Sequence, residues 1–220
     1  MFTVQGPHAI GVPGEIAGYW EAKLRYGNKS ISWGRLVQPT ISMCREGITV
    51  TETLATALAA KQSFTDPGMS QVFINNQTGQ VWRQGDKYKN TKLADTLEAL
   101  AQAGDEGADL FYKGEIADKI VDDLKSVGGN ITKEDLEQYT SEWMVPVNTS
   151  LMNNTIMMFS VPPPASGVVL AAILNIINTF NTTLMDTMFY QRIVESFKWA
   201  YGVRSNLGDP YDEDITDFIK

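Results

Sequence analysis

Side chains suited to acid–base or nucleophilic chemistry are few in this sequence, and they form no recognised catalytic motif. The single histidine, His8, lies in a Gly-Pro-His-Ala stretch near the start of the chain, and histidine is the usual general base near neutral pH. That stretch is predicted to be a loop with no nucleophile nearby, so we assign His8 no catalytic role. No serine occupies a Gly-x-Ser-x-Gly turn, and no glycine-rich phosphate loop is present.

Metal and redox chemistry have equally little support. Cys44 is the single cysteine, so neither a disulfide nor a zinc site built from cysteine pairs is possible within the chain. Its position favours a small buried residue at a helix end, with a reactive thiol beside Arg45 as the alternative. Adjacent carboxylates on a helix point to different sides and predict a solvated face. They occur at Asp122-Asp123 and at Glu134-Asp135. A third group, Asp212-Glu213-Asp214, sits just past a helix, where it could bind a cation, but it lacks the ligand spacing of a calcium loop. We expect no metal site and no cofactor.

The run Pro162-Pro163-Pro164-Ala165-Ser166-Gly167 is the most distinctive local feature. We favour a rigid loop that sets the direction of the helix after it, because proline restricts the backbone. The alternative is an anion site formed by Ser166 and the amides that follow at a helix N-terminus.

Asparagine-linked glycosylation is suggested by six Asn-x-Ser/Thr triplets, whereas chance predicts roughly two. The candidate acceptors are Asn28, Asn76, Asn130, Asn148, Asn153 and Asn181. The excess favours a cell-surface or secreted glycoprotein. Residues 1–6 lack the basic and apolar regions of a signal peptide. We therefore expect a fragment whose own N-terminus, and any membrane anchor there, is missing.

Composition narrows the class of protein further. The chain has 220 residues, of which 43% are hydrophobic and 20% charged, values that are ordinary for a soluble globular domain. The net charge of −8 repels phosphate backbones, so we expect no nucleic-acid partner. The longest apolar run, residues 168–174, is much shorter than the roughly 20 residues that cross a bilayer.

Hydrophobic spacing predicts a mostly helical chain. A helix carrying Ile16 to Leu24 ends at Gly27, and a second, capped by Ser32, is interrupted at Pro39 and stops at Gly47. Thr132 and Asp135 form a near capping box for a short helix. Further helices are predicted over residues 52–62, 91–104, 114–128, 168–177 and 187–203. The helix over 168–177 lacks a polar face and is predicted to be buried on most sides. The last helix is predicted to carry one apolar stripe of Phe189, Ile193, Phe197 and Tyr201.

Two hairpins complete the predicted elements. Residues 71–87 form a small one, and residues 145–151 and 155–161 form strands around a tight turn at Asn153-Asn154. Antiparallel strands that do not alternate with helices predict an α+β fold, or one part of a layered sheet-and-helix fold.

Nine phrases in a fixed order resemble the γ-glutamyltransferase family, and together they cover nearly the whole chain. The first three are Gly11-Val12-Pro13-Gly14-Glu15-Ile16-Ala17-Gly18-Tyr19, Arg25-Tyr26-Gly27 and Trp33-Gly34-Arg35-Leu36-Val37-Gln38-Pro39. The middle three are Leu93-Ala94-Asp95-Thr96-Leu97, Phe111-Tyr112-Lys113-Gly114 and Gly128-Gly129-Asn130-Ile131-Thr132-Lys133-Glu134-Asp135-Leu136. The last are Pro162-Pro163-Pro164-Ala165-Ser166-Gly167, Ile173-Leu174-Asn175 and Arg204-Ser205-Asn206-Leu207-Gly208-Asp209-Pro210.

The resemblance implies a four-layer αββα sandwich of the N-terminal-nucleophile hydrolases. It implies a precursor that cuts itself into a large and a small subunit, with the new N-terminal threonine as nucleophile and its own amine as base. Such enzymes transfer the γ-glutamyl group of glutathione or its conjugates to water, amino acids or dipeptides. Animal members are cell-surface glycoproteins with an N-terminal membrane anchor.

The departures from the family pattern define what this stretch is expected to be. The Thr-x-His-x-Ser-Val segment that carries the nucleophile is absent, so the catalytic threonine is expected beyond Lys220. The arginine that binds the substrate α-carboxylate is expected before Met1, and neither Arg25 nor Arg35 matches it. Residues 1–220 are thus predicted to be a single partial domain, the central part of a large subunit missing both ends, with the small subunit of the same precursor as partner. The alternative is an inactive relative or truncated product that serves as a structural or binding glycoprotein.

Overall fold

The structure is a computed structural model that describes residues 6–60, 67–180 and 185–208. The chain divides into two compact units, an N-terminal unit, Met1–Ser141, and a C-terminal unit, Glu142–Lys220. Each unit is described by itself below. The single partial domain expected over residues 1–220 stays a prediction.

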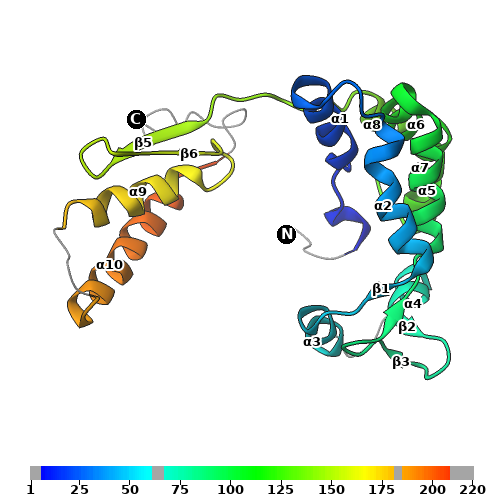
Figure 1. Ribbon diagram of the computed structural model, residues 1–220, viewed down its shortest axis with the longest axis horizontal. Coiled ribbons are helices and arrows are strands. Elements are labelled where there is room, and N and C mark those ends of the chain that lie inside the picture. Colours follow the sequence, from blue (N-terminus) through cyan, green and yellow to red (C-terminus); the bar gives the residue numbers. More distant parts are fainter. Residues whose placement is uncertain (1–5, 61–66, 181–184, 209–220) are drawn as a thin grey trace. The chain divides into compact units, whose positions relative to one another are not determined.

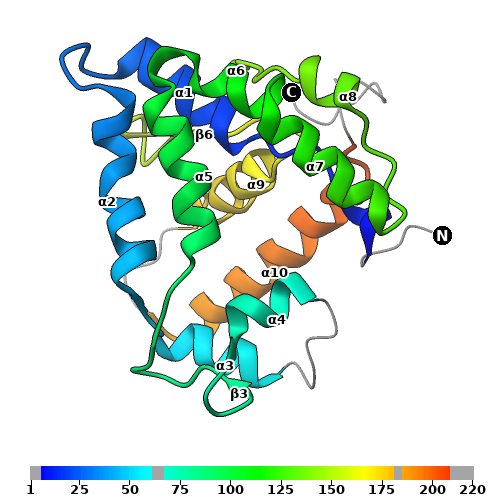
Figure 2. The same ribbon diagram turned by 90° about the vertical axis from the view of Figure 1, so that its right-hand side faces the viewer.

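Helices make up most of the N-terminal unit (Figures 1 and 2). They are η1 (Pro7–Ala9), α1 (Glu15–Tyr26), α2 (Trp33–Glu46), α3 (Glu52–Ala60), α4 (Pro67–Phe73), α5 (Thr91–Gln102), η2 (Gly104–Glu106), α6 (Gly107–Tyr112), α7 (Glu115–Ser126) and α8 (Lys133–Glu137). Two antiparallel pairs of short strands join β1 (Ile48–Thr49) to β4 (Lys87–Tyr88) and β2 (Ile74–Asn75) to β3 (Gln80–Val81).

The contact between α2 and α5 forms the first core cluster of the N-terminal unit. Ile41 and Cys44 of α2 meet Ala94 of α5, and each of the three is at most 2% exposed. Ala94 has only a methyl group, which lets the two helix backbones approach each other. The predicted burial of Cys44 is confirmed, and burial raises the pKa of its thiol, so the alternative of a reactive thiol loses support.

The predicted interruption at Pro39 is wrong, because α2 runs unbroken from Trp33 to Glu46 with this proline inside it. A proline inside a helix removes one backbone hydrogen bond and costs roughly 3 kcal/mol. Burial of Ile41 and Cys44 just beyond it offsets that cost. The Ser32 cap is confirmed, since its hydroxyl accepts a hydrogen bond from the Arg35 amide (3.3 Å).

A second core cluster joins α6, α7 and α8 through Tyr112, Ala117 and Leu136, against which Ile16 of α1 packs. The capping box predicted for α8 is confirmed in both directions. The Thr132 hydroxyl accepts from the Asp135 amide, and the Asp135 carboxylate accepts from the Thr132 amide (2.8 Å). The hydrogen bonds that its carboxylate accepts from the Thr132 amide and hydroxyl lower the pKa of Asp135.

The hairpin predicted over residues 71–87 is only partly present. Val72 and Phe73 belong to α4, and the ladder is limited to Ile74–Asn75 with Gln80–Val81. β4 pairs with β1 instead. The Trp82 indole donates to the Val72 carbonyl (2.8 Å), so a helical turn at Val72 gives that partly buried N–H its acceptor.

The C-terminal unit is a hairpin covered by two helices, with α9 between the hairpin and α10 (Figure 1). Its elements are β5 (Val147–Leu151), β6 (Ile156–Ser160), α9 (Gly167–Asn178) and α10 (Thr187–Arg204). The predicted tight turn is confirmed, with Met152, Asn153 and Asn154 all at positive φ (50°, 52° and 66°). The side chain of Asn178 holds this turn by accepting from the Met152 amide (2.9 Å).

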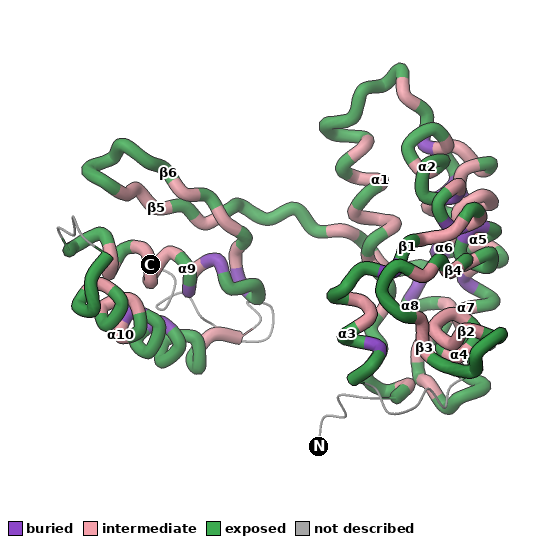
Figure 3. The backbone as a smooth tube through the Cα atoms, turned by 60° about the horizontal axis from the view of Figure 1, so that its bottom comes forward, coloured by how far each residue is buried: buried purple, intermediate pink, exposed green. Residues whose placement is uncertain are grey.

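The burial predicted for most sides of α9 is wrong. Within α9 only Gly167 and Val169 are buried, so the helix keeps half-exposed apolar sides (Figure 3). On α10 the buried residues are Ser196 and Ala200, whereas Phe197 and Tyr201 are 45% and 59% exposed. The small residues face inward because they permit close helix packing, which turns the larger apolar side chains outward.

Replacing Gly167 by alanine is expected to destabilise the C-terminal unit. A methyl group there would overlap the Val161 carbonyl and lie 2.8 Å from the Ser160 hydroxyl, which corresponds to a cost of about 1–3 kcal/mol. The matched control is Gly202→Ala, also in a helix but with open space around the added methyl. That control is expected to stabilise by about 1 kcal/mol. Urea unfolding of both variants measures this, and equal midpoints would contradict the prediction.

The capping box of α8 is expected to make stability depend on pH. Because the folded-state pKa of Asp135 is lowered, its contribution is present above the ordinary carboxyl pKa and is lost as the pH falls through the lowered value. The stability advantage of the wild-type chain over Asp135→Asn should therefore be larger at pH 6 than in strong acid. Thermal melts across that pH range measure it, and an advantage independent of pH would count against the capping role.

Candidate functional site

The residues weighed for chemistry in the sequence are not brought together. His8 is exposed in η1, and Asp122, Asp123 and Glu134 are exposed on their helices, as a solvated face predicts. Asp212-Glu213-Asp214 lies outside the described residues. No cluster of histidine, cysteine and carboxylate side chains suited to a metal occurs among the described residues. In that same part of the chain, no helix combines the length and apolar character needed to cross a bilayer.

The proline-rich loop has the contacts of a packed turn. The Ala165 amide donates to the Pro162 carbonyl (3.1 Å), and Gly167 is buried against the Val161 carbonyl. Ser166 is exposed and its hydroxyl does not cap α9. These contacts agree with the favoured interpretation, a rigid loop that sets the direction of α9.

Residues of α1, α2, α5 and α6 line an apolar groove of about 610 Å³ in the N-terminal unit, and Figure 2 shows how these four helices are arranged. Its walls are mainly apolar, and a few polar side chains, Glu15, Lys23, Thr40 and Thr96, also line it. Apolar clefts of this size with few polar groups are typical of places where another apolar surface or ligand packs. The apolar lining comprises Pro13, Ile16, Tyr19, Ala22, Trp33, Leu36, Val37, Leu93, Leu97, Leu100 and Phe111.

One buried tyrosine holds the α1 wall of this groove in place. The Tyr112 hydroxyl donates to the Pro13 carbonyl (2.5 Å) and accepts from the Ala17 amide (3.2 Å). The N-cap residue of α1, Gly14, has no side chain, so Tyr112 satisfies an amide that a cap residue normally serves. Burial raises the pKa of Tyr112, partly opposed by the hydrogen bond from Ala17.

Aromatic rings and a lysine shape the side of the groove formed by α1 and α2. The rings of Trp20 and Trp33 meet edge-on at 5.3 Å. The Lys23 ammonium lies 4.7 Å from the Trp20 ring and 3.5 Å from Asp105, so this charge is already paired. The buried Trp33 indole nitrogen has no hydrogen-bond partner among the described residues, and it faces Gly107, where a methyl group would lie 3.3 Å away.

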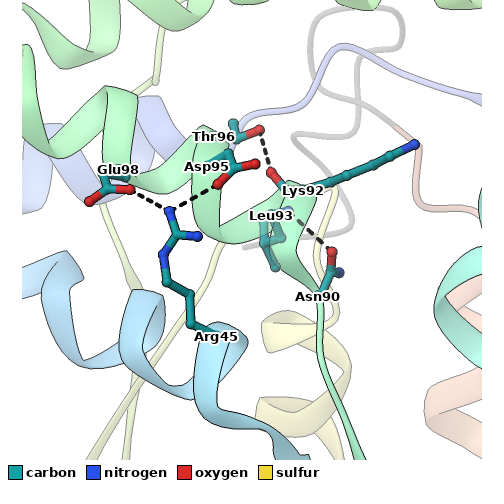
Figure 4. Close-up of polar contacts among 7 residues, drawn as sticks. All are labelled: Arg45, Asn90, Lys92, Leu93, Asp95, Thr96 and Glu98. Atoms are coloured by element: carbon teal, nitrogen blue, oxygen red, sulfur yellow. Dashed lines mark hydrogen bonds and ion pairs between the residues drawn. The ribbon is translucent and has the colours of Figure 1, made fainter.

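Arg45 of α2 binds two carboxylates of α5 (Figure 4). It bonds Glu98, and it bonds Asp95 at 2.9 Å. The hydrogen bond to Glu98, which has the larger effect, and the one to Asp95 both raise the pKa of Arg45. An arginine so occupied is not offered to a substrate carboxylate, so Arg45 serves as a clasp between helices. Exposed ion pairs of this kind contribute little to stability.

The five described sequon asparagines are all exposed: Asn28, Asn76, Asn130, Asn148 and Asn153. Asn181 lies outside the described residues. A bulky sugar chain can be attached only to an exposed asparagine. Each of these five asparagines is therefore accessible for glycosylation in the described part of the chain.

Sequence reasoning missed the groove and the role of Tyr112. The groove joins residues from four helices, and the partners of Tyr112, Pro13 and Ala17, are far from it in sequence. One signal was available in the Val-Pro-Gly-Glu turn, where glycine replaces the usual cap side chain. It indicates that a residue from elsewhere must accept a hydrogen bond from a first-turn amide of α1.

The arrangement of the described residues is suited to packing and to binding. The described residues do not form an acyl-transfer centre. Its fold matches the crystal structure of Helicobacter pylori gamma-glutamyltranspeptidase with a TM-score of 0.87 and 28% identity, over 97% of this chain and 61% of that one. The class is thus α+β, part of the αββα sandwich of the N-terminal-nucleophile hydrolases.

The family follows from the sequence comparison. A family model described as Gamma-glutamyltranspeptidase matches residues 2–220, and the chain belongs to that family. Scoloptoxin SSD14 of Scolopendra dehaani is 35% identical over 98% of this chain and 38% of its own length. Glutathione hydrolase 5 proenzyme of Rattus norvegicus is 36% identical over 94% of this chain and 36% of its own length. The chain therefore spans a little over a third of these two relatives.

Removing the Tyr112 hydroxyl is expected to loosen α1 and destabilise the N-terminal unit. Tyr112→Phe leaves the Ala17 amide and Pro13 carbonyl without their partner, which typically costs about 1–3 kcal/mol. The control is Tyr139→Phe, because Tyr139 stacks on Tyr112 (5.5 Å) but its hydroxyl makes no hydrogen bond within the described residues. Denaturant unfolding compares the two. Equal losses would show that the two hydrogen bonds of the Tyr112 hydroxyl do not hold α1.

Proposed function

We propose that this chain is the large-subunit scaffold of an enzyme that transfers the γ-glutamyl group of glutathione or its conjugates to water, amino acids or dipeptides. The observation that carries the proposal is the family match over residues 2–220. Relatives named glutathione hydrolases, from Arabidopsis thaliana, Rattus norvegicus and Escherichia coli, support a place in glutathione catabolism.

The proposed chemistry is acyl transfer through threonine. The threonine hydroxyl attacks the γ-carbonyl, its own α-amine takes the proton, and the amine of the donor leaves. Water or an acceptor amine then releases the γ-glutamyl group from the resulting ester. The threonine is proposed to lie beyond Lys220, and the arginine for the substrate α-carboxylate before Met1. The residues described here supply support and positioning.

The proposed partner is the small subunit made from the same precursor. Several large apolar side chains of the C-terminal unit are exposed in the chain described, among them Phe159 (69%) and Trp199 (71%). Large apolar side chains that the chain leaves exposed are available for packing against another surface. The name of the rat relative, a proenzyme, agrees with a processed precursor.

A second candidate is an inactive relative, or a truncated product, that serves as a structural or binding glycoprotein. It draws on the same exposed sequons and on the sequence itself, in which no Thr-x-His-x-Ser-Val segment occurs. Both candidates share a cell-surface or secreted location, which is proposed from the sequons.

The two candidates are separated by activity towards a chromogenic γ-glutamyl anilide. The protein carrying residues 1–220 in its native context is expected to release the chromophore, and to lose that activity when the threonine of the Thr-x-His-x-Ser-Val segment becomes alanine. Residues 1–220 alone are expected to be inactive. Turnover by this chain alone that survives repurification would overturn the scaffold role. A native protein that lacks the threonine would favour the glycoprotein.

A further inference from the structure

We propose that Asn28 carries an asparagine-linked oligosaccharide that covers the exposed apolar end of α1. This inference rests on the proposed cell-surface or secreted location, and it selects one of the six sequons by its geometry. The triplet Asn28-Lys29-Ser30 lies between the end of α1 and the start of α2, outside every helix and strand. All three residues are exposed.

The hydrogen bonds of this triplet present the amide nitrogen of Asn28 for reaction. The side-chain oxygen of Asn28 accepts both the Ser30 amide (2.9 Å) and the Ser30 hydroxyl (2.8 Å). The Asn28 carbonyl accepts the Ile31 amide (3.0 Å) and closes the turn. The oxygen of the side-chain amide is thereby occupied within the loop, and its nitrogen, the atom that is modified, is left for solvent.

The other described sequons are bound into structural elements. The Thr132 hydroxyl of the Asn130 triplet donates to the Asp135 carboxylate (2.7 Å) in the capping box. Asn148 lies within β5, opposite Phe159. Asn153 holds a left-handed conformation in the β5–β6 turn. These sites are exposed, but their residues also serve a cap, a ladder or a turn.

The Asn76 triplet is bound into the β2–β3 turn as well. The Thr78 hydroxyl oxygen of this triplet accepts the Gln80 amide (3.3 Å). The Asn28 triplet differs because its two acceptor-sequence side chains bond to each other.

Exposed apolar side chains lie next to Asn28, where an attached sugar would cover them. Tyr26 is 77% exposed and Leu24 is 54% exposed on the last turn of α1, directly before the triplet. A hydrophilic chain attached two residues after Tyr26 covers these exposed apolar side chains. The short loop also has room for a bulky group without displacing a core residue.

The reaction needs a co-reactant of defined chemistry, an oligosaccharide carried on a polyprenyl pyrophosphate. The Asn28 amide nitrogen forms a bond to the anomeric carbon of the sugar and loses one proton. The bond from that carbon to the pyrophosphate breaks, and the polyprenyl pyrophosphate leaves with the electron pair. No oxidation or reduction takes place.

Mass spectrometry of the protein purified from its own cells tests the proposal. Cleavage after Glu21 and Glu46 releases residues 22–46, in which Asn28 is the one sequon. Enzymatic removal of asparagine-linked sugar in heavy-oxygen water should convert Asn28 to labelled aspartate. An unlabelled peptide, with label at any other sequon, would overturn the assignment to Asn28.

Paired variants of the full protein, expressed in eukaryotic cells, separate the sugar from the turn. Asn28→Asp keeps the acceptor oxygen for Ser30 but lacks the amide nitrogen, and it should lose one glycan from the intact mass. Ser30→Thr keeps the sequon and should retain that glycan. Equal masses of glycan on both variants would contradict the proposal. Absence of sugar from all six sequons would overturn it together with the proposed location, while the anilide assay on the same sample reports separately on the γ-glutamyl transfer.

Discussion

The close packing of α2 against α5 is the contact on which the N-terminal unit depends. Ala94 brings the α5 backbone next to Ile41 and Cys44, and burying a side chain such as that of Ile41 contributes about 1.5–3 kcal/mol. That gain offsets Pro39 within α2 and keeps the helix continuous. Arg45 of α2 pairs with Asp95 and Glu98 of α5 across the same contact (Figure 4).

The groove is a consequence of this pair of helices and of the separate attachment of α1. α1 has no cap side chain of its own, and it is held by Tyr112, which belongs to the second core cluster. Two hydrogen bonds fix α1 at its start, Trp20 and Lys23 contact the rest of the unit farther along, and the apolar groove lies between α1 and the α2–α5 pair. The apolar lining of that space and the outward-facing aromatic side chains of α10 have the same physical meaning, namely apolar surface that the described residues do not cover.

The chain belongs to the gamma-glutamyltranspeptidase family, and the uncovered apolar surface is interpreted on that basis. In the proposed function, the described residues support a reacting threonine and a substrate-binding arginine that lie elsewhere in the precursor. A scaffold of this kind is built from packing, capping and ion-pair contacts. The polar contacts of Tyr112, Arg45, Thr132 and Asp135 are accordingly of that type.

Local sequence patterns determined most of the elements. The spacing of apolar residues and the caps at Ser32 and Thr132 place α2, α5, α7 and α8, because these signals act within one or two turns of chain. The ordered phrases also identified the family, which the comparisons show. The six sequons likewise are read directly from adjacent residues.

Only the tertiary structure decided which faces are buried and which strands pair. Ser196 and Ala200, not Phe197 and Tyr201, face inward on α10, because close approach to α9 selects small side chains over large ones. β4 pairs with β1, and Tyr112 serves α1, through contacts between residues distant in sequence. Such contacts depend on where the elements meet in space, and a local pattern of residue types does not specify those positions.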